Sequence, residues 1–261
     1  MTRMARAHDG AGIAWCSTGE GEPLLLISGQ AVDSSAWDAV VPTFAESFRV
    51  ITVDHRGHGG SGVPSARPTE VGTLGRDVLA ALDELGVDRF SVVGVSLGGA
   101  IAQWLAANSG RVDKAVFAAT ATYLGGKQAW EQKINTALHD GTSGLTSTLM
   151  GNWFTESFRA EHPEVVQRVA DMIDSVDDEG YAHNGAALAT WDFAGELGKI
   201  TCPVLTIAGA SDPTCPPEKL AEIAAGVAGP SQSVVVDPAA HQVAIENPQE
   251  FNTALTRFLG N

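Results

Sequence analysis

Short apolar runs alternate along the chain with segments in which apolar residues recur at helical spacing. Each run has the length of a buried strand and ends at glycine or at polar residues. The expected strands are Leu24–Ser28, Arg49–Asp54, Phe90–Val95, Lys114–Ala119, Pro203–Gly209 and Gln232–Asp237. Strands that alternate with helices predict an α/β fold, in which helices cover both faces of a mostly parallel sheet.

The segments between these strands carry an apolar stripe. One expected helix spans Ser34–Ser47, with Trp37 on its apolar side, and a second begins at a Thr69 cap and stops at Gly86. The remaining expected helices are Leu97–Asn108, Pro217–Val227 and Pro248–Leu259.

The alternation is interrupted over residues 121–198, where the pattern is helical. We expect a helical cap, or lid, inserted into a core made of residues 1–120 and 199–261. The cap tryptophans are expected to be core or pocket wall, and they are candidates for substrate binding: Trp130, Trp153 and Trp191. In open α/β sheets functional residues gather at the carboxyl ends of the strands, so the chemistry is expected there.

One strand ends in Gly94-Val95-Ser96-Leu97-Gly98-Gly99, which has the G-x-S-x-G pattern of a nucleophile elbow. In an elbow the serine occupies a strained turn with its hydroxyl above the sheet, and the glycines leave room for the crossing of strand and helix. The pattern also arises by chance, and its place between an expected strand and an expected helix is what supports it here. Ser96 is therefore the candidate nucleophile.

A serine hydroxyl needs a base at neutral pH, and the base needs an acid that orients it. In this fold the order along the chain is serine, acid, histidine. His241 follows the last expected strand and Asp212 follows the strand before it. We expect a triad of Ser96, Asp212 and His241, with Asp237 as the less favoured acid.

The triad requires hydrogen-bond donors for the oxyanion that forms on the substrate. The Leu97 amide opens the helix after the nucleophile, and the positive end of that helix points at the site. Gly29, after the first expected strand, allows close approach, and the Gln30 amide is the natural second donor.

The loop Asp54-His55-Arg56-Gly57-His58-Gly59 is rich in polar groups and is expected to be structural, with His58 in internal hydrogen bonds. Arg56 has an alternative role as a contact to a substrate carboxylate. Three other basic side chains would favour an anionic substrate if they faced the nucleophile: Lys127, Lys133 and Arg159.

The net charge of the chain argues against two classes of binding partner. The 31 acidic and 16 basic side chains give a formal net charge of −15, which argues against nucleic acid or an anionic membrane. The three cysteines lack the spacing of a disulfide framework or a zinc site, and we expect neither a metal nor another cofactor. With no signal peptide and no apolar run long enough to cross a bilayer, the pattern favours a cytoplasmic protein.

These residues together resemble the α/β-hydrolase superfamily over nearly the whole chain. The greatest similarity is to 3-oxoadipate enol-lactonases, through the Asp54–Gly59 loop, Ile101-Ala102-Gln103-Trp104-Leu105-Ala106 after the elbow, and Phe154-Thr155-Glu156-Ser157-Phe158-Arg159 in the cap. The resemblance implies hydrolysis of a small anionic lactone in aromatic catabolism. The segment Ser28-Gly29-Gln30-Ala31-Val32-Asp33 departs from it, because it lacks the superfamily's His-Gly and is shorter than the enol-lactonase form.

The sequence therefore predicts a serine hydrolase that acts on a small carboxylic ester or lactone, foremost 3-oxoadipate enol-lactone. The alternatives are a broader carboxylesterase and a cofactor-free haloperoxidase or perhydrolase on the same fold. A binding protein that signals through its cap is a further alternative, because fold alone does not give function.

Overall fold

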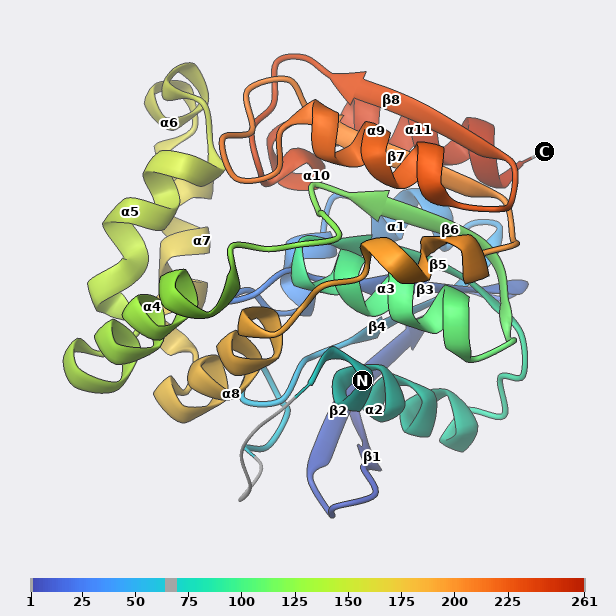
Figure 1. Ribbon diagram of the computed structural model, residues 1–261, viewed down its shortest axis with the longest axis horizontal. Helices are drawn as coiled ribbons and strands as arrows, with labels where there is room; N and C mark the ends of the chain where they lie inside the picture. Colours follow the sequence, from blue (N-terminus) through green and yellow to red (C-terminus); the bar gives the residue numbers. More distant parts are fainter. Residues whose placement is uncertain (1, 64–69, 261) are drawn as a thin grey trace.

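The computed structural model describes residues 2–63 and 70–260. Its centre is an eight-stranded sheet in the order β1-β2-β4-β3-β5-β6-β7-β8 (Figure 1). The strands are β1 (Arg3–Arg6), β2 (Gly12–Thr18), β3 (Glu22–Ile27), β4 (Phe48–Val53), β5 (Phe90–Val95), β6 (Val112–Ala118), β7 (Val204–Gly209) and β8 (Ser231–Val236). From β4 to β8 the pairings are parallel, which confirms the predicted α/β sheet.

Successive residues of the central strands face two separate apolar layers. Leu25 and Ile27 pack with α2 (Val71–Glu84), α3 (Leu97–Asn108) and α9 (Pro217–Gly226). The neighbouring Leu24 and Leu26 point the other way and pack with α1 (Val41–Phe44), α10 (Val243–Glu246) and α11 (Pro248–Leu259). Because side chains alternate along a strand, a sheet buried on both faces needs apolar residues at consecutive positions. This is why these strands appear in the sequence as unbroken apolar runs.

The expected single helix over Ser34–Ser47 is wrong. The chain forms a short 3₁₀ helix, η1 (Ser34–Trp37), and then the separate α1. Pro42 explains the break, because in one continuous helix its ring would clash with the carbonyl four residues earlier. In the first turn of α1 it meets no such carbonyl.

Two other expectations concern the edges of elements. The Thr69 cap lies outside the described residues, whereas Gly86 follows α2 with a φ of 65°, as a helix-stopping glycine should. The antiparallel strands β1 and β2 are not among the expected strands, and β1 is short and mostly exposed and carries little apolar signal.

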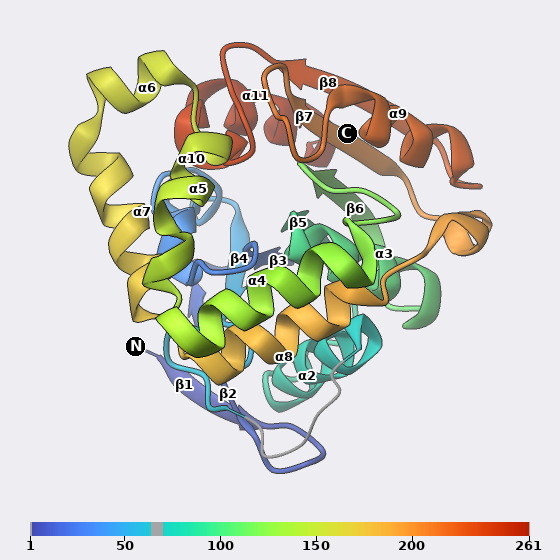
Figure 2. The same ribbon diagram turned by 60° about the vertical axis from the view of Figure 1, so that its left-hand side comes forward.

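A group of helices follows β6 and precedes β7 in the chain. In space these helices cover the carboxyl ends of the strands (Figures 1 and 2). We call α4–α8 the cap: α4 (Gly126–Asp140), α5 (Ser143–Trp153), α6 (Glu156–Glu161), α7 (Pro163–Ser175) and α8 (Asp178–Ala189). In Figure 2, α4 and α8 lie side by side over the centre of the sheet. After α8, the 3₁₀ helix η2 (Ala194–Lys199) packs against α3 and α9 of the core.

Within the described residues, no helix combines the length and the apolar character needed to cross a bilayer.

Candidate active site

Ser96 occupies the sharp turn between β5 and α3. Its φ is 55° and its ψ is −114°, an unusual conformation for a residue that has a side chain. Such conformations cost of order 1–3 kcal/mol and persist only where the surrounding structure enforces them. Glycine makes the turn possible: a Cβ on Gly94 would lie 2.1 Å from the Gly98 carbonyl oxygen, and a Cβ on Gly98 would lie 2.1 Å from that of Ile27. The absence of a side chain at Gly94 and Gly98 is thus the physical reason why the predicted elbow can form.

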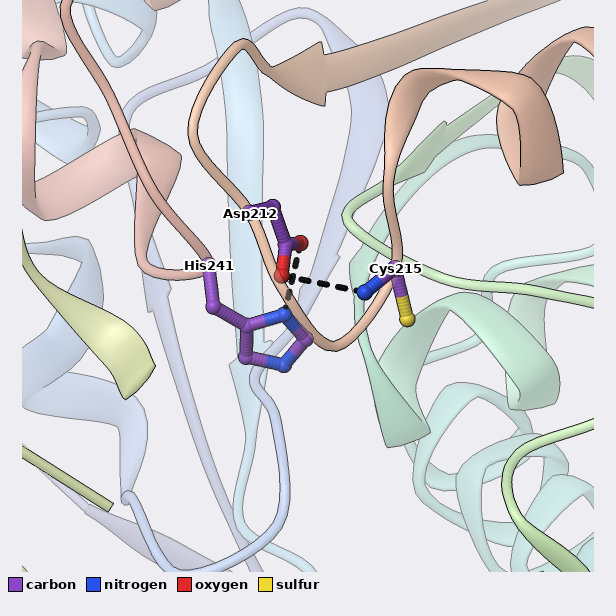
Figure 3. Close-up of side chains that lie close together, drawn as sticks. All are labelled: Asp212, Cys215 and His241. Carbon is purple, nitrogen blue, oxygen red and sulfur yellow. Dashed lines mark hydrogen bonds and ion pairs between the residues drawn. The ribbon is translucent and has the colours of Figure 1, made fainter. Parts of the chain in front are cut away.

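Asp212 and His241 are brought together from the ends of β7 and β8 (Figure 3). His241 Nδ1 donates to Asp212 Oδ2 at 2.8 Å, and both side chains are almost fully buried. The other carboxylate oxygen accepts from the Thr214 and Cys215 amides at 2.8 and 3.0 Å. Asp237, the less favoured acid, lies exposed at the end of β8.

The Asp212 carboxyl remains ionised in this setting. Burial on its own would raise its pKa, but the facing His241 imidazole and the hydrogen bonds from that imidazole and the two amides outweigh burial, so the pKa is lowered. An ionised carboxylate at Nδ1 keeps the proton on that nitrogen and leaves Nε2 able to accept one. His241 and Ser96 line the same cavity, so the arrangement is suited to withdrawing a proton from the serine hydroxyl.

The predicted oxyanion donors flank the serine. Leu97 is the first residue of α3, where a backbone N–H has no acceptor within its own helix. Gln30 lines the cavity beside Ser96. The loop before it passes close by, since a Cβ on Gly29 would lie 3.4 Å from the Ser96 Cβ. Their role as donors stays a prediction.

Two buried histidines support this loop from below. His58 Nε2 accepts the Ala31 amide at 2.9 Å, so the ring proton sits on Nδ1, which donates to the Arg56 carbonyl at 2.9 Å. His55 Nε2 donates to the Ser28 carbonyl at 2.7 Å. Burial, and after it the neighbouring His55, lowers the pKa of His58 to about 3. The ring therefore stays neutral, in the structural role expected of it.

Arg56 does not line the cavity. Its guanidinium is buried, with Nη2 2.6 Å from Asp77 Oδ1, Nη1 2.6 Å from Asp9 Oδ2, and Nε also bonded to Asp77. Burial would lower its pKa, but these carboxylates outweigh burial and raise it. A substrate carboxylate would have to displace existing partners, so the alternative role considered for Arg56 is not supported.

The cavity at Ser96 lies between core and cap and has a volume of about 150 Å³. Its wall is mostly apolar, with a few polar groups, as is usual for a small-molecule site. The lining residues are Gln30, Ala31, Ser96, Tyr123, Leu124, Gly125, Trp130, Lys133, Leu149, Trp153, Tyr181, Leu188, Thr214 and His241.

Two of the three candidate tryptophans, Trp130 and Trp153, belong to this wall, and the Trp153 ring lies 6.3 Å from that of His241. Trp191 lies elsewhere: its indole N–H donates to the Ala121 carbonyl at 3.0 Å, and its ring stacks on Phe193. We therefore retain only the first two as candidate substrate contacts.

Lys133 is the basic side chain that the cap brings to this cavity, out of the four that the sequence offered. Its Nζ lies 4.3 Å from the centre of the Trp130 ring, and burial lowers its pKa. Lys127 is exposed beside Glu131, and Arg159 donates to backbone carbonyls at the end of α5. Trp130 and Lys133 are three residues apart on one helix, which was the only signal that could have paired them in advance.

Cys215 completes a compact group with the acid and the imidazole (Figure 3). Asp212, Cys215 and His241 offer donor atoms within 4.8 Å of one another, which is close enough for a metal site. However, burial and the adjacent Asp212 hold the pKa of the Cys215 thiol well above its usual range. The His241 Nδ1 proton also lies between the imidazole and the carboxylate, which accepts it in a hydrogen bond. The arrangement is better suited to proton transfer than to metal binding.

A family model described as the alpha/beta hydrolase fold matches residues 22–248. The chain belongs to this family. It is 33% identical to 3-oxoadipate enol-lactonase 2 of Acinetobacter baylyi over 235 residues, which are 89% of this chain and 87% of that protein.

Two solved structures have the same architecture, each with a TM-score of 0.95. One is a hydrolase from Pseudomonas aeruginosa PA01, with 34% identity over 100% of this chain and 98% of that one. The other is the enol-lactonase from Burkholderia xenovorans LB400, with 29% identity over 99% and 100%. The α/β-hydrolase assignment thus holds for both sequence and fold, and it identifies the protein as a hydrolase.

Proposed function

We propose that this α/β-hydrolase cleaves a small anionic carboxylic ester or lactone by a serine mechanism, and that 3-oxoadipate enol-lactone is its substrate. The observation that carries the substrate class is Lys133, a cation in the wall of the cavity that also holds Ser96 and His241. The enol-lactonase relatives support the choice of lactone. Such an enzyme would serve the breakdown of aromatic compounds.

In the proposed mechanism, His241 Nε2 takes the proton of Ser96 Oγ while the oxygen attacks the substrate carbonyl. The Leu97 and Gln30 amides hold the oxyanion, and Asp212 stabilises the imidazolium. His241 then protonates the departing oxygen. Water, activated by the same imidazole, releases the acyl group. With an enol-lactone, the departing enol becomes a ketone, and no cofactor is needed.

Lys133 would hold the carboxylate of the substrate while its carbonyl lies at Ser96. The ammonium is partly withdrawn from water and rests on Trp130, so an ion pair there is screened less than one on the surface. A neutral ester would gain nothing from this group. Selectivity for anionic substrates should therefore depend on Lys133, whereas the chemical step should depend on the triad.

The test compares hydrolysis of 3-oxoadipate enol-lactone with that of a neutral p-nitrophenyl ester in wild type, Ser96→Ala and Lys133→Met. We expect wild type to prefer the lactone and Ser96→Ala to be inactive on both. Lys133→Met should raise KM for the lactone about tenfold, the loss of one modest ion pair, and leave the ester unchanged. Lys127→Met, an exposed lysine of the same helix, is the matched control.

The other outcomes separate the alternatives. Cleavage of the neutral ester alone would replace the lactonase proposal by a broader carboxylesterase. Peroxide-dependent oxidation in the presence of a short organic acid would indicate a perhydrolase. Biological activity that survives Ser96→Ala would point to a binding protein.

A further inference from the structure

Phe154 and Thr155 make a compact turn between α5 and α6. The Thr155 hydroxyl accepts the Phe158 amide at 3.3 Å and so caps α6. Arg159 Nη1 donates to the Gly151 and Phe154 carbonyls at 3.1 and 2.6 Å and closes α5. These contacts explain the shape of the turn. They leave open why the turn lies beside the His241 loop.

Glu246, at the end of α10, makes the contact between this cap turn and the His241 loop. Its Oε1 accepts the Thr155 amide at 3.0 Å and also the Thr155 hydroxyl. Its Oε2 accepts the amide of Ala240, the residue before His241, at 2.7 Å. The residue is 9% exposed, so one buried carboxylate joins the cap to the loop of the catalytic base.

A second hydrogen bond also joins the cap to the His241 loop. The Gln242 amide, directly after His241, donates to the Trp153 carbonyl at 3.0 Å. The residues on both sides of His241 are thus tied to two neighbouring cap residues, Trp153 and Thr155. Since the Trp153 ring forms cavity wall beside the imidazole, the wall and the base are held in one hydrogen-bonded unit.

We propose that Glu246 is a positioning residue for catalysis, which fixes the His241 imidazole relative to Ser96 by holding the Ala240 amide and the cap residue Thr155 at once. This inference rests on the proposed role of His241 as general base. Bonds to an ionised carboxylate are short and strong, and buried ones are poorly replaced by water. Without this carboxylate, the His241 loop would keep the Gln242 bond and could shift.

The first variant to make is Glu246→Gln, which retains the size of the side chain. A glutamine has one acceptor oxygen, and its amide nitrogen would face a backbone N–H. The variant must therefore lose the hydrogen bond either to the Ala240 amide or to the Thr155 amide, and so opens one side of the bridge that Glu246 forms between loop and cap. We expect kcat for the lactone to fall about tenfold to a hundredfold, the scale set by a small misplacement of a catalytic group, while KM changes little. Inactivation of Ser96 by a fluorophosphonate, which needs the base but no carboxylate pocket, should slow by a similar factor.

Thr155 provides matched variants on the cap side. Thr155→Val removes the hydroxyl from Glu246 and should lower kcat severalfold, whereas Thr155→Ser keeps the hydroxyl and should restore kcat. Thr136→Val deletes another cap hydroxyl, which donates to the Gln132 carbonyl within α4, and should leave kcat unchanged. Because both bonds belong to one bridge, the effects of Glu246→Gln and Thr155→Val should not add in the double variant.

The proposal is overturned if Glu246→Gln and Thr155→Val lower the melting temperature but leave kcat and the fluorophosphonate rate at wild-type values. If Glu246→Gln does not fold, the comparison of Thr155→Val with Thr155→Ser decides in the same way. A wild type that does not react with the fluorophosphonate would instead refute the serine mechanism itself, and this inference with it.

Discussion

His58 lies beneath the loop that carries Gln30, with both ring nitrogens in hydrogen bonds. Its folded-state pKa of about 3 lies below the ordinary value of 6.5, so at intermediate pH the unfolded chain binds a proton that the folded chain does not. The stability due to the neutral ring is therefore fully present above pH 6.5 and is lost as the pH falls toward 3.

The free energy of unfolding, measured in urea between pH 7.5 and 4.5, should show this. Below pH 6.5 the wild-type value should fall more steeply than that of His58→Gln, by about 1.4 kcal/mol per pH unit for the one proton. The exposed His139 gives the control, and His139→Gln should follow the wild-type curve. Parallel curves for wild type and His58→Gln would contradict the assignment of a buried neutral ring.

Variants of Asp212 and Asp237 test which aspartate is the acid of the candidate triad. Asp212→Asn keeps the shape but loses the charge that holds the Nδ1 proton and stabilises the imidazolium, and we expect kcat to fall about 10⁴-fold. Asp237→Asn changes an exposed side chain and should stay within about twofold of wild type, as surface changes usually do. Initial rates at pH 7–8 measure both. A large loss in Asp237→Asn would reverse the assignment.

At the scale of elements, α8 is fixed to the core by a contact between two glycines. A Cβ on Gly180 would lie 2.4 Å from the Cα of Gly57, a distance that real Cβ atoms do not adopt. The Asp177 amide donates to the Gly57 carbonyl at 3.2 Å, and Gln30 Nε2 donates to the Tyr181 carbonyl at 2.9 Å. The start of α8 and the loop of the predicted oxyanion donor are thereby held together.

Gly180→Ala should force α8 away from the core. Overpacking of this kind costs about 1–3 kcal/mol, and since Tyr181 lines the cavity, KM should rise as well. Gly151→Ala in α5 is the matched control: a Cβ there meets nothing within 4 Å, and alanine should stabilise the helix by about 0.5–1 kcal/mol. Urea unfolding gives both values. Equal stability of the two variants would show that the glycine contact is not tight.

For the whole molecule, the net charge of −15 is the dominant electrostatic property. Like charges repel one another in the compact state, and salt screens this repulsion over a Debye length of about 8 Å at physiological ionic strength. We expect the melting temperature to rise by about 2–4 °C between 0.02 and 0.5 M NaCl, the shift that roughly 1 kcal/mol would give in a chain of this size. A falling melting temperature would mean that exposed ion pairs such as Arg89–Asp113, which salt also screens, outweigh the repulsion.

Much of this structure could be read from local sequence. The parallel strands appear as apolar runs because each is buried on both faces, and the elbow appears because only glycine allows its strand and helix to cross so closely. The order of the chain placed Ser96, Asp212 and His241 at strand ends, and parallel strands end at one edge of the sheet. Local pattern and topology therefore sufficed to bring these three residues together.

Other features were decided by contacts between distant parts of the chain. Arg56 and Lys133 look alike as isolated basic residues, but Asp9 and Asp77 bind the first, while the packing of α4 over the sheet brings the second to the cavity. Glu246 gave no signal, because its partners lie 6 and 91 residues away. The sequence by itself determined the parallel part of the sheet, the elbow and the candidate triad, because these follow from local periodicity and strand order. The cavity wall, its charge and the bridge to the cap were decided by tertiary structure, since they depend on which side chains find partners when the cap closes over the core.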